Sequence, residues 1–239
     1  MKRIFAIILA LMLLVSLAAC GEQKTDKTAT VDEATEAVSG GWTVNEALTA
    51  VMLPSEVQTA FDKAVGALDG MDYSPVAYIG SQVVAGMNYA VLCKAATVTA
   101  EPVISLKVLI IYADLNGNAE VTNVADFNIA DYAVGEGKTP EQLAGGWSAP
   151  EEVVGSGLST EADAAYDKAM DGYAGGVTAP LAELGTQVVA GTNYAILSHC
   201  IPVTENSVPC IQVVNIYSDL DGNAEINNVC TLDIADFTA

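Results

Sequence analysis

The order of hydrophobic and polar residues changes from a helical to a strand-like pattern along the chain. Residues 55–68, "SEVQTAFDKAVGAL", place Val57, Phe61, Ala64, Val65 and Leu68 on one side of a helix, which predicts a helix with one buried face. The stretches 75–95 and 104–124 are rich in β-branched and aromatic residues, as strands are. Their length predicts four antiparallel strands arranged as two hairpins.

The same pattern occurs a second time, 105 residues later and without any insertion or deletion. Trp42 corresponds to Trp147, Asp62-Lys63 to Asp167-Lys168, Tyr112 to Tyr217 and Asn118 to Asn223. The counterpart helix places Tyr166, Ala169, Met170 and Tyr173 on its buried face. Two units of about ninety residues are a duplicated domain rather than a solenoid. We therefore expect a first repeat at 41–130, a linker at 131–145 and a second repeat at 146–239, each folding alone.

Local signals predict where the elements begin and turn. Ser55 with Gln58, and Thr160 with Asp163, have the spacing of helix caps. Asn116-Gly117 and Asp221-Gly222 are typical of type I′ hairpin turns. The alternate acidic residues of "DLDGNAE" at 219–225 also suggest the start of a calcium loop, but the glycine is the fourth residue instead of the sixth and the twelfth is Cys230. The turn is therefore favoured, and no metal site is expected.

The first twenty residues are a targeting segment. Lys2 and Arg3 precede an apolar run at 4–16, and "LAAC" follows at 17–20. These four residues resemble the lipobox of bacterial lipoproteins, which implies that Cys20 carries lipid and anchors an extracytoplasmic protein to the cell membrane. The alternatives are an ordinary secretory signal or a membrane span, for which the run is short. Residues 21–40 are small and polar, as in a flexible tether.

Charge and residue inventory exclude several classes of function. The formal net charge is −21 with nine Lys plus Arg, so nucleic acid is not an expected partner. His199 is the only histidine, its counterpart is Lys94, and we expect it to be an ordinary strand residue. We expect Asp62-Lys63 and Asp167-Lys168 to be solvated helix surface. The sequence therefore predicts a binding protein without cofactor rather than an enzyme.

Cysteines follow Cys20 at four positions. Cys200 and Cys210 flank "IPVTENSVP", which reads as strand, turn and strand, so a disulfide across this hairpin and a pair of reduced thiols both remain open. Their first-repeat counterparts are Ala95 and Ser105, so the fold does not need the bridge. Cys93 and Cys230 lie in different repeats and are left unpaired.

One pentapeptide suggests a family. "QVVAG" followed by "NY" occurs at 82–89 and 187–194, and it resembles the Gln-x-Val-x-Gly first hairpin of cystatins, the inhibitors of cysteine peptidases. "GGWT" at 40–43 and "GGWS" at 145–148 resemble the cystatin N-terminal trunk, and "AFDKA", "AYDKA", "IIYADL" and "NIYSDL" are similar to its helix and to the strand before its second hairpin. The Pro-Trp of many second hairpins is replaced by "LNGN" and "LDGN".

The resemblance implies an α+β fold of two tandem cystatin-like domains, each a curved antiparallel sheet packed around one helix. It further implies that the protein inhibits a papain-like cysteine peptidase by filling its cleft, with the two glycines of the pentapeptides lying against the catalytic wall. The alternatives are a surface recognition module that binds a protein or glycan and, more weakly, a calcium-binding spacer. The implied contact residues are Gly41, Gln82, Val83, Val84, Ala85, Gly86, Leu115, Gly146, Gln187, Val188, Val189, Ala190, Gly191 and Leu220.

Overall fold

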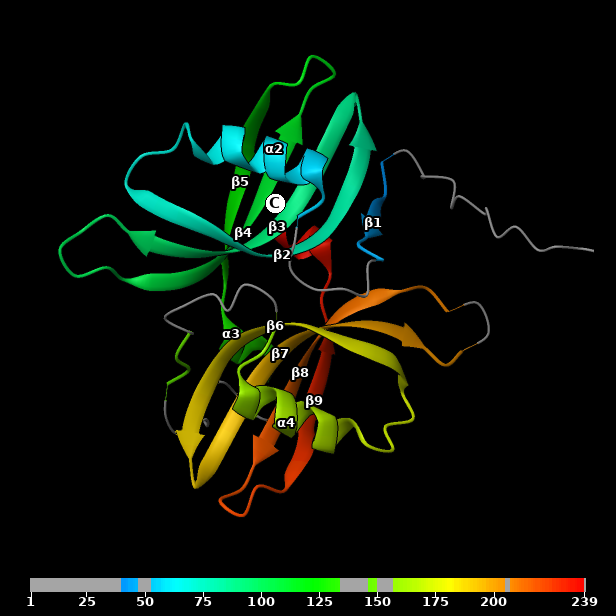
Figure 1. The fold of residues 1–239 in the computed structure, drawn as a ribbon. Coiled ribbons are helices and arrows are strands. Elements are labelled where there is room, and N and C mark those ends of the chain that lie inside the picture. Colours follow the sequence, from blue (N-terminus) through cyan, green and yellow to red (C-terminus); the bar gives the residue numbers. More distant parts are fainter. Residues whose placement is uncertain (1–39, 47–52, 134–145, 150–156, 205–206, 239) are drawn as a thin grey trace, which may run out of the picture. The chain divides into compact units, whose positions relative to one another are not determined.

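The computed structural model describes residues 40–46, 53–133, 146–149, 157–204 and 207–238 (Figure 1). The predicted signal peptide, Cys20 and nearly all of the predicted tether lie outside the described residues, as does most of the predicted linker. Residues Ala37–Ala239 form one compact unit that contains both repeats. Within the described residues, no helix is long and apolar enough to cross a membrane.

The first repeat forms a five-stranded antiparallel sheet and one longer helix. Its strands lie in chain order, so each pairs with the next along the chain. The elements are β1 (Trp42–Val44), α2 (Ser55–Val65), β2 (Met71–Val84), β3 (Gly86–Thr97), β4 (Ile104–Ala113) and β5 (Ala119–Phe127), followed by the short α3 (Ile129–Ala133). The two predicted hairpins are present, and β1 is an additional strand at the edge of β2.

The second repeat forms a four-stranded antiparallel sheet with the same strand order. Its elements are α4 (Thr160–Met170), β6 (Gly176–Val189), β7 (Gly191–Pro202), β8 (Cys210–Ser218), β9 (Ala224–Thr231) and the 3₁₀ helix η2 (Ile234–Phe237). In place of a strand like β1, the described part of the preceding segment makes an isolated bridge between Ser148 and Thr186.

Each longer helix covers one face of its own sheet. Figure 1 shows α2 lying across the sheet of the first repeat. Its residues Val57, Phe61 and Ala64 are buried in one cluster with strand residues such as Val91 and Leu109. In the second repeat Tyr166 is buried, whereas Ala169, Met170 and Tyr173 are only partly buried. The i, i+3, i+4 pattern therefore placed both helices correctly, but only four of the nine predicted face residues are buried, and Leu68 and Tyr173 lie beyond the helix ends.

The predicted helix caps were wrong by one residue. Pro54 is the N-cap of α2 and provides no side-chain hydrogen bond, and Gln58 donates to Asp62 instead of closing a capping box. Ser159 is the N-cap of α4, where its hydroxyl accepts from the backbone N–H of Ala162. Proline has no N–H, so one unpaired donor is missing at this helix start, but no side chain caps the first turn of α2.

The opposite face of each sheet is also buried. Side chains of both sheets form one hydrophobic cluster, which includes Leu92 and Val108 from the first repeat and Leu197 and Val213 from the second. Strands β3 and β7 are buried on both faces, so apolar residues run through them almost without alternation.

This shared cluster overturns the predicted fold class. The chain is mostly antiparallel sheet, with sheets of five and four strands and few helices, and it is not a tandem of cystatin-like domains each packed around its own helix. A cystatin-like domain would have one core between its sheet and its helix. Here each sheet has a second core, and that core contains residues of the other repeat.

The segment after the last strand of each repeat packs on the other repeat. The Asn123 side chain donates to the backbone oxygen of Phe237 at 2.7 Å. In the reciprocal contact Asn228, which lies 105 positions after Asn123, donates to the backbone oxygen of Tyr132 at 3.0 Å. Thus α3 of the first repeat packs on the second repeat, and η2 of the second repeat packs on the first. We call α3 and η2 the exchanged segments.

Two glycines make room for these exchanged segments. A Cβ on Gly80 would lie 2.4 Å from the Thr43 oxygen and 2.7 Å from the Ile234 side chain. A Cβ on Gly185 would lie 2.6 Å from the Ser148 oxygen and 2.8 Å from the Ile129 side chain. Glycine allows this close approach because it has no side chain.

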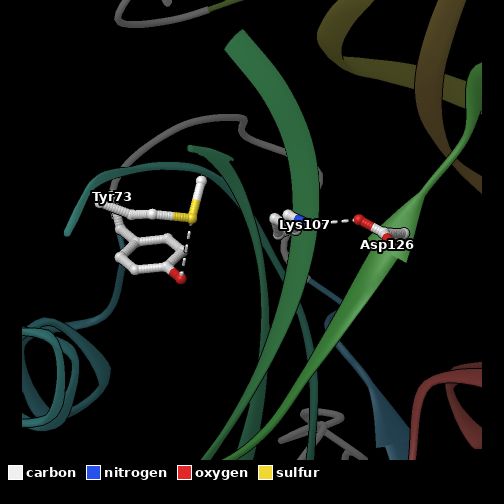
Figure 2. A network of polar contacts seen from close by, with 4 residues as sticks. Tyr73, Lys107 and Asp126 are labelled. Carbon is white, nitrogen blue, oxygen red and sulfur yellow. Dashed lines mark hydrogen bonds and ion pairs between the residues drawn. The ribbon is translucent and has the colours of Figure 1, made fainter. Parts of the chain in front are cut away.

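An ion pair joins the neighbouring strands β4 and β5 away from these contacts. Lys107 on β4 donates to the carboxylate of Asp126 on β5, as Figure 2 shows. The two residues are direct cross-strand partners, and Asp126 is largely exposed. The pair therefore supports strand register and contributes little to stability.

Candidate binding site

The hairpin between β2 and β3, and its counterpart between β6 and β7, turns over a single exposed alanine. Val84 pairs with Gly86, which leaves Ala85 at the end; Val189 and Gly191 flank Ala190 in the same way. We call residues 84–86 and 189–191 the first tips. Each places two small apolar residues and the buried glycine at the end of a long hairpin.

The glycine of each first tip is required by the fold of this chain. Gly86 has φ +133° and Gly191 has φ +129°, a region that favours glycine. A Cβ would lie 2.3 Å from the backbone oxygen of Ala113 in one repeat and 2.3 Å from that of Ser218 in the other. Both glycines are buried, and the fold of the chain accounts for them without any partner.

The glutamine of the pentapeptide is also part of the scaffold. The Gln82 amide oxygen accepts from Asn88 at 2.7 Å, and its nitrogen donates to the Gly40 oxygen at 2.9 Å. Gly40 in turn donates to the Val83 oxygen at 3.2 Å. These bonds hold the segment before β1 beside the first tip. In the second repeat Gln187 is buried and accepts from Asn193 at 2.7 Å.

The hairpins β4–β5 and β8–β9 end in three-residue loops instead of the predicted two-residue type I′ turns. The Gly117 N–H donates to the Asp114 oxygen, and the Asp114 carboxylate accepts from the N–H groups of Asn116 and Asn118. Gly117 has φ +81°, as in a type I turn followed by a left-handed glycine. The three-residue loop forms instead of the two-residue turn because the aspartate side chain accepts hydrogen bonds from the loop backbone. We call residues 114–118 and 219–223 the second tips.

The second tips are preformed and carry an exposed leucine. Leu115 is 86% exposed and Leu220 is 87% exposed. Hydrogen bonds from Asn118 hold the pKa of Asp114 below its ordinary value, and Asn223 does the same for Asp219. These carboxylates therefore remain charged acceptors in mildly acidic solution, and the loops keep their shape.

Two side chains on each repeat hold its tips in place. The Tyr112 hydroxyl donates to the Ala85 oxygen at 2.7 Å, which links a first tip to the strand that leads to a second tip. The Lys63 amine of α2 donates to the Gly117 oxygen at 2.6 Å. Tyr217 and Lys168 make the same contacts with Ala190 and Gly222. Lys63 and Lys168 are exposed helix residues, as expected, and each also makes this contact with a loop oxygen.

The structure thus brings the two tips of each repeat to the same end of its sheet. The exposed residues of the predicted site are Gly41, Val84, Ala85, Leu115, Gly146, Val188, Val189, Ala190 and Leu220. Gln82 and Val83 are partly buried, and Gln187, Gly86 and Gly191 are buried. Tyr112, Tyr217, Lys63, Lys168, Asn88 and Asn193 were not predicted as site residues. The sequence feature that could have identified them is that the same residue types recur at the same positions of both repeats.

His199 lies on β7 in the sheet interior, as expected of a strand residue. Neither of its ring nitrogens has a hydrogen-bond partner among the described residues. Burial lowers its pKa, an effect that Glu46 partly opposes. The described residues contain no group of three or more metal-ligating side chains that could hold an ion.

Cys200 and Cys210 are directly opposite each other on β7 and β8, and the strand, turn and strand predicted around them are present. The four cysteines of the described residues carry free thiols in this structure. Burial raises the pKa of Cys200 to about 11, with a smaller contribution from Cys210. The two thiols are thus neighbours, and either redox state remains compatible with this placement.

Comparisons with known proteins add no family to this geometry. No protein-family model matches the chain, and no curated protein matches its sequence.

Proposed function

We propose that the protein is a binding protein which inhibits a papain-like cysteine peptidase by inserting paired hairpin tips into its cleft. The observation that carries the proposal is the exposure of apolar side chains on preformed tips: Val84 and Leu115 in the first repeat, and Val188, Val189 and Leu220 in the second. Aliphatic side chains at the ends of rigid loops bury apolar surface in a partner at little entropic cost.

Charge and hydrogen bonding support a cleft-filling role over catalysis. The Asp114 carboxylate is engaged with its own loop, and the Gly117 oxygen accepts from Lys63 of α2. These groups hold the tips in place and leave the apolar side chains to make contact. The inhibitor needs no cofactor, and it acts by occupying the substrate cleft.

The test is a titration of the soluble form, residues 21–239, against a panel of papain-like peptidases. The wild type is expected to inhibit at least one of them. Leu115→Asp combined with Leu220→Asp is expected to weaken inhibition at least about tenfold, because an apolar contact is replaced by a desolvated charge. The matched control is Val98→Asp with Val203→Asp, which are 62% and 74% exposed in the hairpins at the opposite end of each sheet.

Each result of this titration has a defined meaning. Loss of inhibition in the leucine variant but not in the valine control supports insertion of the tips. Equal loss in both variants shows that the acidic substitution itself, not the tip, is responsible. A wild type that inhibits no enzyme of the panel overturns the inhibitor proposal.

A second candidate is a recognition module that binds a protein or glycan without inhibition. It is favoured by Gly86 and Gly191, since the fold of this chain already accounts for both glycines. The same variants separate the candidates. A module of this kind binds surface components of cells in a pull-down with wild type, loses them with the leucine variant, and leaves the peptidases active.

We also propose that Cys20 is lipidated and holds the protein at the outside of the bacterial membrane. The support is the order of positive residues, apolar run and "LAAC" in the sequence. Metabolic labelling with a fatty-acid analogue should mark the wild type and not Cys20→Ala, whereas equal labelling of both removes the anchor. A tether of about twenty residues then leaves the repeats free to meet a partner.

A further inference from the structure

The carbonyl group at each first tip is held by a tyrosine of the same repeat. Tyr112 reaches from β4 to the Ala85 oxygen at 2.7 Å, and Tyr217 reaches from β8 to the Ala190 oxygen at 2.6 Å. The two contacts lie 105 residues apart, so the duplicated sequence kept donor and acceptor together. Both tyrosines are only partly buried, and no core packing requires their hydroxyl groups.

The peptide bond after this carbonyl joins an exposed alanine to a buried glycine with positive φ. Ala85 is exposed, but the following Gly86 is buried with φ +133°. The position of a Cβ on Gly86 would lie 3.0 Å from the Tyr112 ring. The tyrosine therefore contacts the tip in two ways: its ring lies close to Gly86, and its hydroxyl donates to the Ala85 oxygen.

A peptidase needs this bond in a different conformation and with its carbonyl oxygen free. Hydrolysis requires an extended segment whose carbonyl oxygen accepts hydrogen bonds from the oxyanion hole of the enzyme. In the first tip that oxygen already accepts from Tyr112, and the chain turns back at Gly86. A small apolar segment such as Val84-Ala85 would otherwise be a good substrate for peptidases that prefer small residues.

We propose that Tyr112 and Tyr217 are positioning residues that prevent cleavage of the first tips, so that the tips remain inhibitors and do not become substrates. The choice of a cysteine peptidase as the enzyme rests on the proposed function; the protection itself does not. The reaction prevented is hydrolysis of the Ala85–Gly86 and Ala190–Gly191 bonds. One water is consumed at each bond: its oxygen enters the alanine carboxylate, and the glycine nitrogen leaves as an amine.

The first experiment uses an elastase-type endopeptidase that cuts after small apolar residues. Residues 21–239 of wild type, Tyr112→Phe and Tyr217→Phe are incubated with it, and intact mass and fragment masses are recorded over time. Phenylalanine keeps the ring and removes only the hydroxyl. Tyr112→Phe is expected to be cut between Ala85 and Gly86 about tenfold faster than wild type, which corresponds to loss of one hydrogen bond.

Internal and external controls keep this test specific. In Tyr112→Phe the intact Tyr217 should still protect Ala190–Gly191, and the reverse should hold in Tyr217→Phe. Tyr73→Phe is the matched external control, because the Tyr73 hydroxyl donates only to the Met71 sulfur at 3.7 Å, at the opposite end of β2 from the first tip (Figure 2). Equal cleavage of wild type and variants at the tips would overturn the proposal, as would cleavage of both tips in a single variant.

The second experiment repeats the incubation with the papain-like peptidase that the wild type inhibits most strongly. The double variant is expected to inhibit at first and to lose inhibition as the tip fragments appear, whereas the wild type inhibits without loss. A double variant that inhibits as lastingly as wild type and stays intact would overturn the inference and leave the inhibitor proposal standing. If the wild type inhibits no peptidase, the proposed function fails, and the elastase experiment alone decides the role of the tyrosines.

Discussion

Phe127 and Phe237 stack with their ring centroids 6.1 Å apart and an angle of 20° between the ring planes. Phe127 ends the last strand of the first repeat, and Phe237 lies in η2 of the second. Tyr132 also stacks on Phe127, with the ring centroids 4.8 Å apart. This aromatic group shows that the exchanged segments are part of the shared core.

The shared core predicts that the repeats stay together after the chain is cut. A recognition site for a specific endopeptidase inserted after Lys138, between the described parts of the repeats, should give two fragments that co-elute in size-exclusion chromatography. They should separate only in denaturant, since parting them exposes apolar residues of both sheets. Separation in native buffer would restore the expectation, drawn from the sequence alone, that each repeat folds alone.

Substitution of the glycines beneath the exchanged segments should destabilise the whole unit. Gly80→Ala and Gly185→Ala each introduce a Cβ closer than 3.0 Å to a backbone oxygen. A backbone oxygen cannot move aside as the end of a flexible side chain can. We expect a loss of about 1–3 kcal/mol in the free energy of unfolding for each. Gly146→Ala is the control, because a Cβ there meets nothing within 4 Å. Denaturant titration of the three variants checks the order; similar midpoints would contradict the packing.

His199 should make stability fall as the solution becomes acidic. Its folded-state pKa is lowered below the ordinary value of 6.5, so the unfolded chain takes up the proton first. The contribution of the neutral ring is complete above that value and is lost as the pH falls below it. His199→Leu should therefore lose less stability than wild type between about pH 8 and about pH 5.5. Parallel curves of stability against pH for the two proteins would show that His199 is not the cause.

Cys200 and Cys210 should form a disulfide in the presence of oxidised glutathione, which takes up the two electrons and two protons. Opposite residues of antiparallel strands lie about 4.5–5.5 Å apart at Cα, within the range of a disulfide. Cys93 is fully buried and burial raises its pKa, so it should remain a thiol. Maleimide labelling with peptide mapping measures this, with Cys210→Ser as control. A stable glutathione adduct on Cys210 of the wild type would show that the pair does not close.

The local structure followed from the sequence because its causes are local. Apolar spacing predicted α2 and α4, and β-branched stretches predicted the hairpins. The Asn116-Gly117 dipeptide predicted a two-residue type I′ turn, but the hairpin has a three-residue loop because the side chain of Asp114 bonds the loop backbone. The first tips were also placed correctly, and the need for Gly86 comes from the neighbouring strand β4.

The core between the repeats was missed for a physical reason. A single apolar run such as "YAVLC" at 89–93 indicates burial on both faces but does not say what covers the second face. The repeated "NIADYA" and "DIADFT" segments at 128–133 and 233–238 were visible in the sequence too. Their exchange depends on contacts such as Asn123 with Phe237, which join residues more than one hundred positions apart.

The exchange of α3 and η2 sets the order in which a newly made chain can acquire its structure. The first repeat has its helix and strands by residue 127, but the residues that cover Gly80 and bond to Asn123 come only at 234–237. A chain that emerges N-terminus first therefore exposes one apolar face of the first sheet until η2 follows. That interval covers residues 128–233, a little under half of the 239 residues, and a chaperone that protects the exposed face acts during it.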